Sequence, residues 1–208
     1  MIEKVFNGAY LKRLDNLVQW SEKDIFTRET VSSHSYKVTI FCRVLLEEIF
    51  EGNCSEEVIT FKLKCVDHAM FHDWDESLLL RDISHETKYN SYNGKEIRDA
   101  LDNLSTHLAV AEFLDGSFAG QFIFGAMNEM NEDVNTFCKV CDWLALAFFI
   151  KRERSMGNQN LDAQETTVKV GLRKSIDKCK RMLVERFYKA NIKVSIFEVL
   201  MESIYGKY

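Results

Sequence analysis

The chain has 208 residues, of which 46% are hydrophobic, and carries a formal net charge of −5 with a pI of about 5.6. This length suits one domain with a substantial core. The acidic balance argues against a nucleic-acid or membrane-surface binder, because such proteins usually carry a basic stripe. The longest apolar run, residues 143–150, is far shorter than the ~20 residues that a membrane span needs. We therefore expect neither nucleic acid nor a membrane as a partner.

Six cysteines in a chain of this length do not make a disulfide scaffold, and several of them fall at apolar helical positions. We expect buried free thiols in a reducing compartment, which makes a cytoplasmic location the prediction, in the host if the protein is viral. The N-terminal stretch carries charges throughout and lacks the apolar run of a signal peptide. The complete absence of proline is compatible with long helices.

The first strong helical pattern lies in residues 32–52. Its apolar positions follow the i, i+3, i+4, i+7 spacing of a helix that faces a core, at Val38, Phe41, Cys42, Leu45, Leu46 and Ile49. Ser32 or Ser33 is expected to cap the start of this helix, and Gly52 to end it. His34 is then expected near the helix start, on or beside the buried face.

Helical patterns continue along most of the remaining chain. The predicted helices cover about residues 55–72, 94–114, 117–130, 131–154, 160–191 and 194–205, and the stretches 27–32, 81–94 and 154–162 read as loops. No repeat, low-complexity tract or linker divides the chain. The sequence therefore predicts an all-α fold in a single domain, residues 1–208.

The stretch CVDHAMFHDWDES, residues 65–77, carries the strongest chemical signal. His72 and Asp73 are adjacent at the predicted helix end, where their side chains point about 100° apart. They can still chelate one ion that lies off the helix end. If the helix continues past Asp73, the side chain of Glu76 lies on the same side of the helix as those of His72 and Asp73. A carboxylate close to a metal ion can position or deprotonate a water molecule.

Two further residues strengthen the metal hypothesis. His34 is predicted on a buried helix face, and Asp142 lies inside the apolar segment VCDWLALA. A buried aspartate is costly unless it is paired or ligated. Imidazole and carboxylate suit Zn, Fe, Mn, Co or Ni, and carboxylate with water suits Mg, so the identity of the ion stays open.

Four segments in this order, RETVSSHS, FHDWDES, RDISHETKY and VCDWLALA, resemble the HD superfamily of metal-dependent phosphohydrolases. Within it, they are most similar to the bacterial HD-domain 5′-deoxynucleotidases and their phage relatives. The resemblance covers roughly residues 10–150 and leaves residues 159–208 as additional C-terminal helices. It implies an HD-type helical bundle that holds a metal ion between helices.

The resemblance also implies roles for individual residues. One divalent ion is expected to bind His34, His72, Asp73 and Asp142. Glu76 matches the catalytic carboxylate that orients or activates the attacking water, and Asp82 matches a second catalytic acid. The resemblance places Trp20, Lys88 and the position of Gln19 at the substrate. Arg28 and His85 are further substrate-binding candidates from their loop positions alone, and a plain loop arginine is an equal interpretation of Arg28. Gln19 stands where the family usually has an arginine.

The implied function is hydrolysis of a deoxynucleoside 5′-monophosphate to deoxynucleoside and phosphate. The first alternative is a deoxynucleoside triphosphate triphosphohydrolase, for example a phage-type dATPase. Gln19 and the position of Asp82, one residue further from the His-Asp pair than in the family, keep this alternative open. A non-catalytic, metal-stabilised nucleotide-binding protein is the lesser alternative, because a structural site has no need of Glu76. The family tends to dimerise, so a homodimer or higher homo-oligomer is expected.

Other motifs give weaker signals. His68 and His72 form an H-x-x-x-H pair, but Ala69 stands where a zincin has its glutamate. Cys138 and Cys141 form a C-x-x-C in the middle of a predicted helix, which favours core thiols over a redox motif. His107 is expected to be a partly exposed helix residue.

Overall fold

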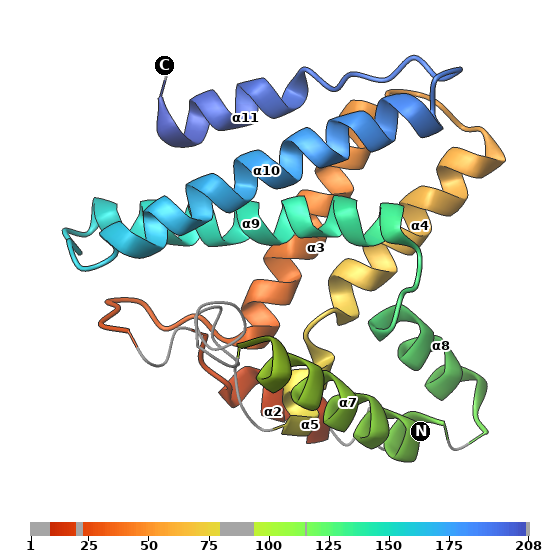
Figure 1. The fold of residues 1–208 in the computed structure, drawn as a ribbon, viewed down its shortest axis with the longest axis vertical. Helices are drawn as coiled ribbons and strands as arrows, with labels where there is room; N and C mark the ends of the chain where they lie inside the picture. The colour runs from red at the N-terminus through yellow and green to blue at the C-terminus, as the bar shows by residue number, and fades with distance from the viewer. Residues whose placement is uncertain (1–8, 20–22, 80–93, 115, 207–208) are drawn as a thin grey trace. The chain divides into compact units, whose positions relative to one another are not determined.

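The computed structural model describes residues 9–19, 23–79, 94–114 and 116–206 (Figure 1). Within these ranges the secondary structure is helical and contains no strand, although an isolated antiparallel bridge joins Val18 and Thr30. The helices are α2 (Ala9–Asn16), α3 (Val31–Ile49), α4 (Glu56–Phe71), α5 (Trp74–Leu79), α7 (Gly94–Phe113), α8 (Phe118–Met127), α9 (Glu132–Ser155), α10 (Asp162–Arg186) and α11 (Ile196–Tyr205). The predicted all-α fold is confirmed.

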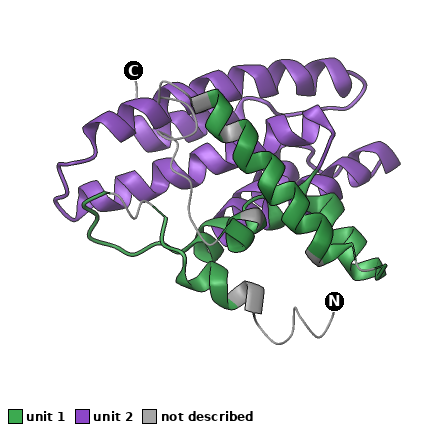
Figure 2. Ribbon diagram, turned by 60° about the horizontal axis from the view of Figure 1, so that its bottom comes forward, with its two compact units in different colours: residues 1–35, 71–128 green, residues 36–70, 129–208 purple. Residues whose placement is uncertain are grey.

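The chain forms two compact units, each made of two separate stretches (Figure 2). Unit 1 comprises residues 1–35 and 71–128, and unit 2 comprises residues 36–70 and 129–208. The boundaries fall inside α3 and at the last residue of α4, so both helices contribute to both units. The single domain expected from the sequence stays a prediction.

Unit 1 packs the short helix α5 against both α2 and α7, and α8 against α7. Its core consists of Leu14, Val31, Phe71, Trp74, Ala109, Phe113, Ile123 and Ala126. The Trp74 ring centroid lies 4.7 Å from that of Phe71 and 6.3 Å from that of Phe113. Because its first residue is held among these aromatic rings, α5 has a fixed position in the unit.

In unit 2, α10 lies along α9 and α11 contacts α9 (Figure 1). The Phe61 ring lies 5.9 Å from Phe137 of α9 and 5.2 Å from Phe187, which follows α10. Gly171 of α10 faces the indole of Trp143, and a Cβ atom placed there would come within 2.6 Å of the indole Cζ2 atom. A glycine at this position therefore allows the close approach of the two helices.

The helix boundaries differ from the prediction in several places. Thr30, not Ser32 or Ser33, caps α3: its Oγ1 accepts a hydrogen bond from the Ser33 backbone N–H (3.2 Å), and its own N–H donates to Ser33 Oγ (3.1 Å). This reciprocal pair is a capping box with serine in the fourth position. The predicted helices 117–130 and 160–191 end earlier, because α8 ends at Met127 and α10 at Arg186. The end of α4 at Phe71 agrees with the prediction, but a separate helix, α5, begins at Trp74.

All six cysteines are free thiols, and five of them are buried, with only Cys54 exposed. Burial raises the pKa values of Cys65, Cys138 and Cys141 well above the ordinary value of a thiol. The Cys138 thiol donates to the backbone carbonyl of Cys65 at 3.2 Å. The C-x-x-C motif therefore lies within α9 as core thiols, as predicted.

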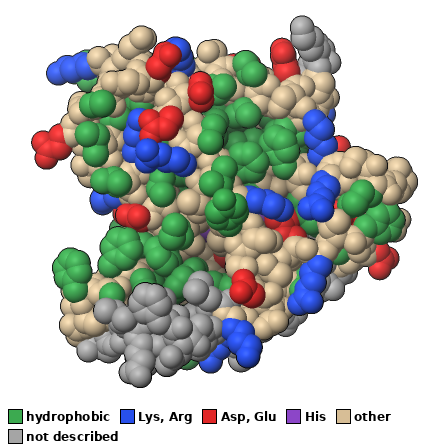
Figure 3. Space-filling view, turned by 180° about the vertical axis from the view of Figure 1, so that it is seen from behind, with side chains coloured by type: hydrophobic (Ala, Val, Ile, Leu, Met, Phe, Trp, Pro, Cys, Tyr) green, Lys and Arg blue, Asp and Glu red, His purple; other side chains and the backbone are tan. Residues whose placement is uncertain are grey.

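Charged side chains of both signs are interspersed with hydrophobic ones on the face that Figure 3 shows. Among the helices that the structure describes, none combines the length and the apolar character required to cross a membrane.

Candidate metal centre

His34 lies in the first turn of α3, where its position follows from the cap. Its backbone N–H donates to the carbonyl of Thr30 at 2.9 Å, in the turn that the Thr30–Ser33 pair closes. The residue is buried, with 1% of its surface exposed, which confirms the prediction of a histidine on the buried side of the helix. A side chain held this way needs little ordering before it binds a ligand.

His72 and Asp73 occupy the break between α4 and α5. The Nε2 atom of His72 lies 3.0 Å from Oδ2 of Asp73, and the Nε2 atom of His34 lies 4.0 Å from the same oxygen. The two imidazole rings have their centroids 5.8 Å apart, and each ring has a nitrogen within 4.8 Å of one of the other. All three residues belong to unit 1, so one carboxylate oxygen lies beside two imidazoles within that unit.

This donor set fits a divalent metal ion. Imidazole nitrogens and carboxylate oxygens are ligands of divalent transition metals, and the three donors come from two separate chain segments. The side chains of His72 and Asp73 keep 15% and 18% of their surface exposed. The site is therefore accessible to solvent on the side of these two residues, and its chemistry does not decide between the metals.

Glu76 follows the His-Asp pair on α5. Its backbone N–H donates to the carbonyl of Asp73 at 3.1 Å, and 3% of its surface is exposed. The hydroxyl of Ser77 donates to the carbonyl of Trp74 at 2.6 Å and closes the same turn. The carboxyl group of Glu76 thus sits in a protected environment on a short helix that the aromatic core fixes.

Asp142 lies in α9 and belongs to unit 2. Its side chain is 15% exposed, and the Nζ atom of Lys139 donates to its Oδ2 atom at 2.5 Å. The same Nζ atom lies 5.1 Å from the centroid of the Trp143 ring. Lys139 was not predicted from the sequence, although its spacing of three residues from Asp142 on a helix was a usable signal.

A family model of YfbR-like 5′-deoxynucleotidases matches residues 7–193. The chain belongs to this family. The protein is therefore a hydrolase, and more narrowly a metal-dependent phosphohydrolase, as the resemblance implied. Comparison with the sequences of curated proteins found no significant match.

Solved structures confirm the HD fold. An HD-domain phosphohydrolase from Listeria innocua superimposes with a TM-score of 0.66 at 19% identity, covering 98% of this chain and 93% of the other. A protein from Pyrococcus horikoshii OT3 gives a TM-score of 0.61 at 19% identity, covering 97% of this chain and 99% of the other.

Two of the predicted substrate-binding residues of this YfbR-like protein lie in the described part of unit 1. Gln19 is buried, and its backbone N–H donates to the carbonyl of Glu29 at 2.8 Å. The guanidinium group of Arg28 donates to the carbonyl of Asn16 at 3.3 Å. The remaining predicted residues, Trp20, Asp82, His85 and Lys88, lie outside the described residues.

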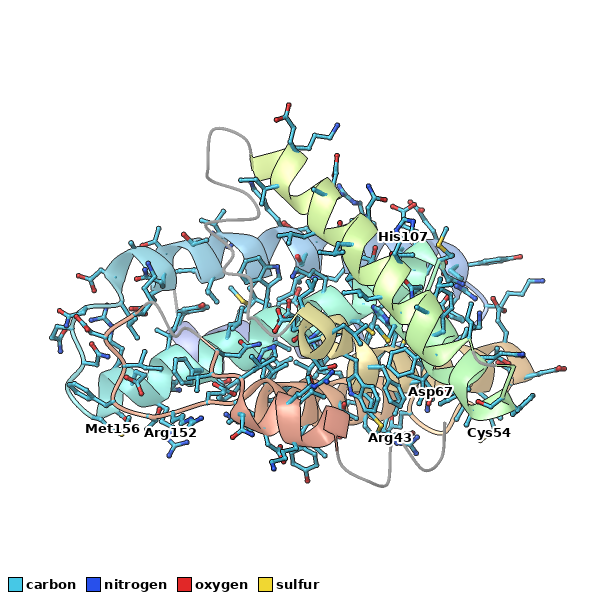
Figure 4. The ribbon with its side chains drawn as sticks, turned by 90° about the horizontal axis from the view of Figure 1, so that it is seen from below. Arg43, Cys54, Asp67, His107, Arg152 and Met156 are labelled. Atoms are coloured by element: carbon cyan, nitrogen blue, oxygen red, sulfur yellow. The ribbon has the colours of Figure 1, made fainter. Side chains whose placement is uncertain are left out.

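His68 and His107, the two histidines with weaker sequence signals, both lie on helices. His68 is partly buried on α4, on the unit 2 side of the boundary, whereas His72 is in unit 1. His107 is exposed on α7, with its Nδ1 atom 2.6 Å from the carbonyl oxygen of Asn103 (Figure 4). His107 was expected to be a partly exposed helix residue, and it lies exposed on the helix.

Proposed function

We propose that the protein is a 5′-deoxynucleotidase, which hydrolyses a deoxynucleoside 5′-monophosphate to deoxynucleoside and phosphate. One divalent ion is bound by His34, His72, Asp73 and Asp142. The observation that carries this proposal is the Asp73 carboxylate beside two imidazoles, with Glu76 buried on the next turn. Membership of the YfbR-like family supports the phosphomonoester substrate.

The bound ion supplies Lewis-acid chemistry, which polarises a phosphoryl oxygen and makes water more acidic. Glu76 accepts a proton from the attacking water, whose oxygen forms the new bond to phosphorus. The bond between phosphorus and the 5′ oxygen breaks, and Asp82 provides the proton that the departing 5′ oxygen takes up. The water oxygen thus ends in the phosphate, and the deoxynucleoside leaves with a protonated 5′ hydroxyl group.

The substrate-binding part of the proposal concerns five residues. Trp20 lies against the nucleoside, and Gln19 offers its side-chain amide as a hydrogen-bond donor. Arg28 and Lys88 compensate the phosphate charge, and His85 contacts the substrate from the same segment as Lys88. A deoxynucleoside monophosphate carries far fewer negative charges than a nucleic acid. It is therefore repelled less by a chain of net charge −5.

A second candidate is a deoxynucleoside triphosphate triphosphohydrolase, which releases triphosphate in one step. The specific observation in its favour is Gln19, a buried neutral side chain where the related nucleotidases have a cation for the monophosphate. A homodimer or higher homo-oligomer also stays a prediction.

Product analysis tests the proposal. The purified protein is supplied in turn with Mn²⁺, Co²⁺ or Mg²⁺ and is offered the four monophosphates and the four triphosphates. Orthophosphate release from a monophosphate, lost in Asp73→Ala and Glu76→Ala, is the expected result. Tripolyphosphate release from a triphosphate favours the second candidate. Metal binding without turnover of any nucleotide refutes both and leaves a non-catalytic binding protein.

A further inference from the structure

Lys139 has an unusual combination of partners for an exposed lysine. Its Nζ atom lies 2.5 Å from Oδ2 of Asp142 and 5.1 Å from the centroid of the Trp143 ring, while its side chain remains 46% exposed. The indole is itself held in place, because it is 7% exposed and packs against α10 at Gly171. The ammonium group is thus positioned beside a proposed metal ligand and still reaches solvent.

Under the proposed function, the charges around the ion favour such a group. If Asp73, Glu76 and Asp142 act on one ion as proposed, their three carboxylates exceed the two charges of a divalent ion. A phosphate monoester adds up to two more negative charges. Unbalanced negative charge in a partly buried site weakens anion binding, so a nearby cation is needed to offset it.

We propose that Lys139 is a substrate-binding residue, whose ammonium group contacts the phosphate of a nucleotide bound at the ion that Asp142 helps to hold. This inference rests on the proposed function, because it takes Asp142 as a metal ligand. It goes beyond that proposal by giving a role to a residue that is neither a ligand nor an acid-base group. The lysine ammonium, a compact point charge with three donors, suits a phosphate oxygen.

The test measures the binding of inorganic phosphate to the Mn²⁺-loaded protein by isothermal titration calorimetry. Lys139→Met removes the charge and keeps the length of the side chain, and is expected to weaken phosphate binding by at least about 10-fold. Lys139→Arg retains the charge and is expected to recover most of the affinity. Melting curves of both variants, followed by circular dichroism, should match the wild type because the side chain is exposed.

Lys178→Met is the matched control. Lys178 is an exposed lysine of unit 2 whose Nζ atom lies 2.8 Å from Oε1 of Glu132, so it forms a comparable ion pair elsewhere. Wild-type affinity in Lys178→Met supports the inference. Equal losses in Lys139→Met and Lys178→Met, unchanged affinity in Lys139→Met, or an Arg variant as weak as the Met variant would overturn it. A wild-type protein that binds Mn²⁺ but no phosphate would overturn this inference, whereas the proposed function is decided separately by nucleotide turnover.

Discussion

The Nε2 atom of His72 lies 3.0 Å from Oδ2 of Asp73, although the two residues are neighbours in the sequence. In a continuous helix, adjacent side chains point about 100° apart and cannot meet at one point. The break between α4 and α5 removes this restriction, because neither residue is inside a helix. The end of α4 is therefore what brings an imidazole and a carboxylate together.

Replacement of Asp73 by Asn should abolish tight metal binding. The amide keeps the size of the side chain but removes the negative charge beside two imidazoles. The loss of affinity should exceed the roughly 10- to 100-fold that the removal of a residue supporting a ligand costs. Calorimetric titration with Mn²⁺ measures it, and wild-type affinity in Asp73→Asn would show that this carboxylate is not a ligand.

Glu76→Gln should separate metal binding from turnover. The amide cannot accept the proton of the attacking water, so kcat should fall by about 10²- to 10⁴-fold. Mn²⁺ affinity should change little, because Glu76 is not among the proposed ligands. Steady-state kinetics measures kcat and calorimetry measures Mn²⁺ affinity, both on the same preparation. If Glu76→Gln loses both turnover and Mn²⁺ affinity, Glu76 is a metal ligand instead.

Gly171→Ala should destabilise the protein, although alanine is the better helix former by about 1 kcal/mol. The new methyl group would lie 2.6 Å from the rigid indole of Trp143, and overpacking of this kind costs about 1–3 kcal/mol. Gly125→Ala in α8 is the matched control, because a Cβ atom there meets nothing within 4 Å. Chemical denaturation should show lower stability for the first variant and equal or higher stability for the second. If both variants gain stability, the Trp143 contact is not restrictive.

The ion pair between Lys62 and Glu47 should make stability depend on pH. The hydrogen bond from Lys62 Nζ to Glu47 Oε2, 2.7 Å long, is the main cause that lowers the pKa of Glu47. Because the folded-state pKa lies below the unfolded one, the pair contributes fully above about pH 4.3, the unperturbed glutamate value. Its contribution is lost as the pH falls through the folded-state pKa.

Urea denaturation between pH 7 and pH 3 tests this dependence. In Lys62→Met the free energy of unfolding should decline less steeply below about pH 4.3 than in the wild type. Glu47→Gln should flatten the curve in the same way, since it removes the titrating group. Parallel curves for wild type and variants would show that the pair does not contribute to the acid sensitivity.

Much of the fold could be predicted from the sequence because helical periodicity is a local signal. The apolar stripe from Val38 to Ile49 predicted α3, and the segment around Asp142 predicted α9. The end of α4 was predicted to within one residue, but the separate helix that begins at Trp74 was not, because a helix of 6 residues is too short to show a clear periodic pattern. The pattern also gave no clear signal for α2, a short helix of eight residues.

The candidate site was predictable only in part, for physical reasons. His34, His72 and Asp73 were found because their residue types suit a metal ion and their order resembles a known family. The contact of Lys139 with Asp142 depends on a side-chain rotamer, and the approach of Trp143 to Gly171 depends on the packing of two helices. The spacing of three residues allows the first contact without requiring it, and the second contact has no local signal, which is why both entered only with the structure.

The division of each unit into two stretches affects how the chain folds during synthesis. Residues 36–70 leave the ribosome long before residues 129–208, which contain the remaining helices of unit 2. Until then the apolar faces of α3 and α4 lack the partners that Phe61 and Phe50 find in Phe137 and Phe187. Nascent chains that expose such surface are prone to aggregate. A chain that ends at residue 128 should therefore aggregate, even though it retains every residue of unit 1.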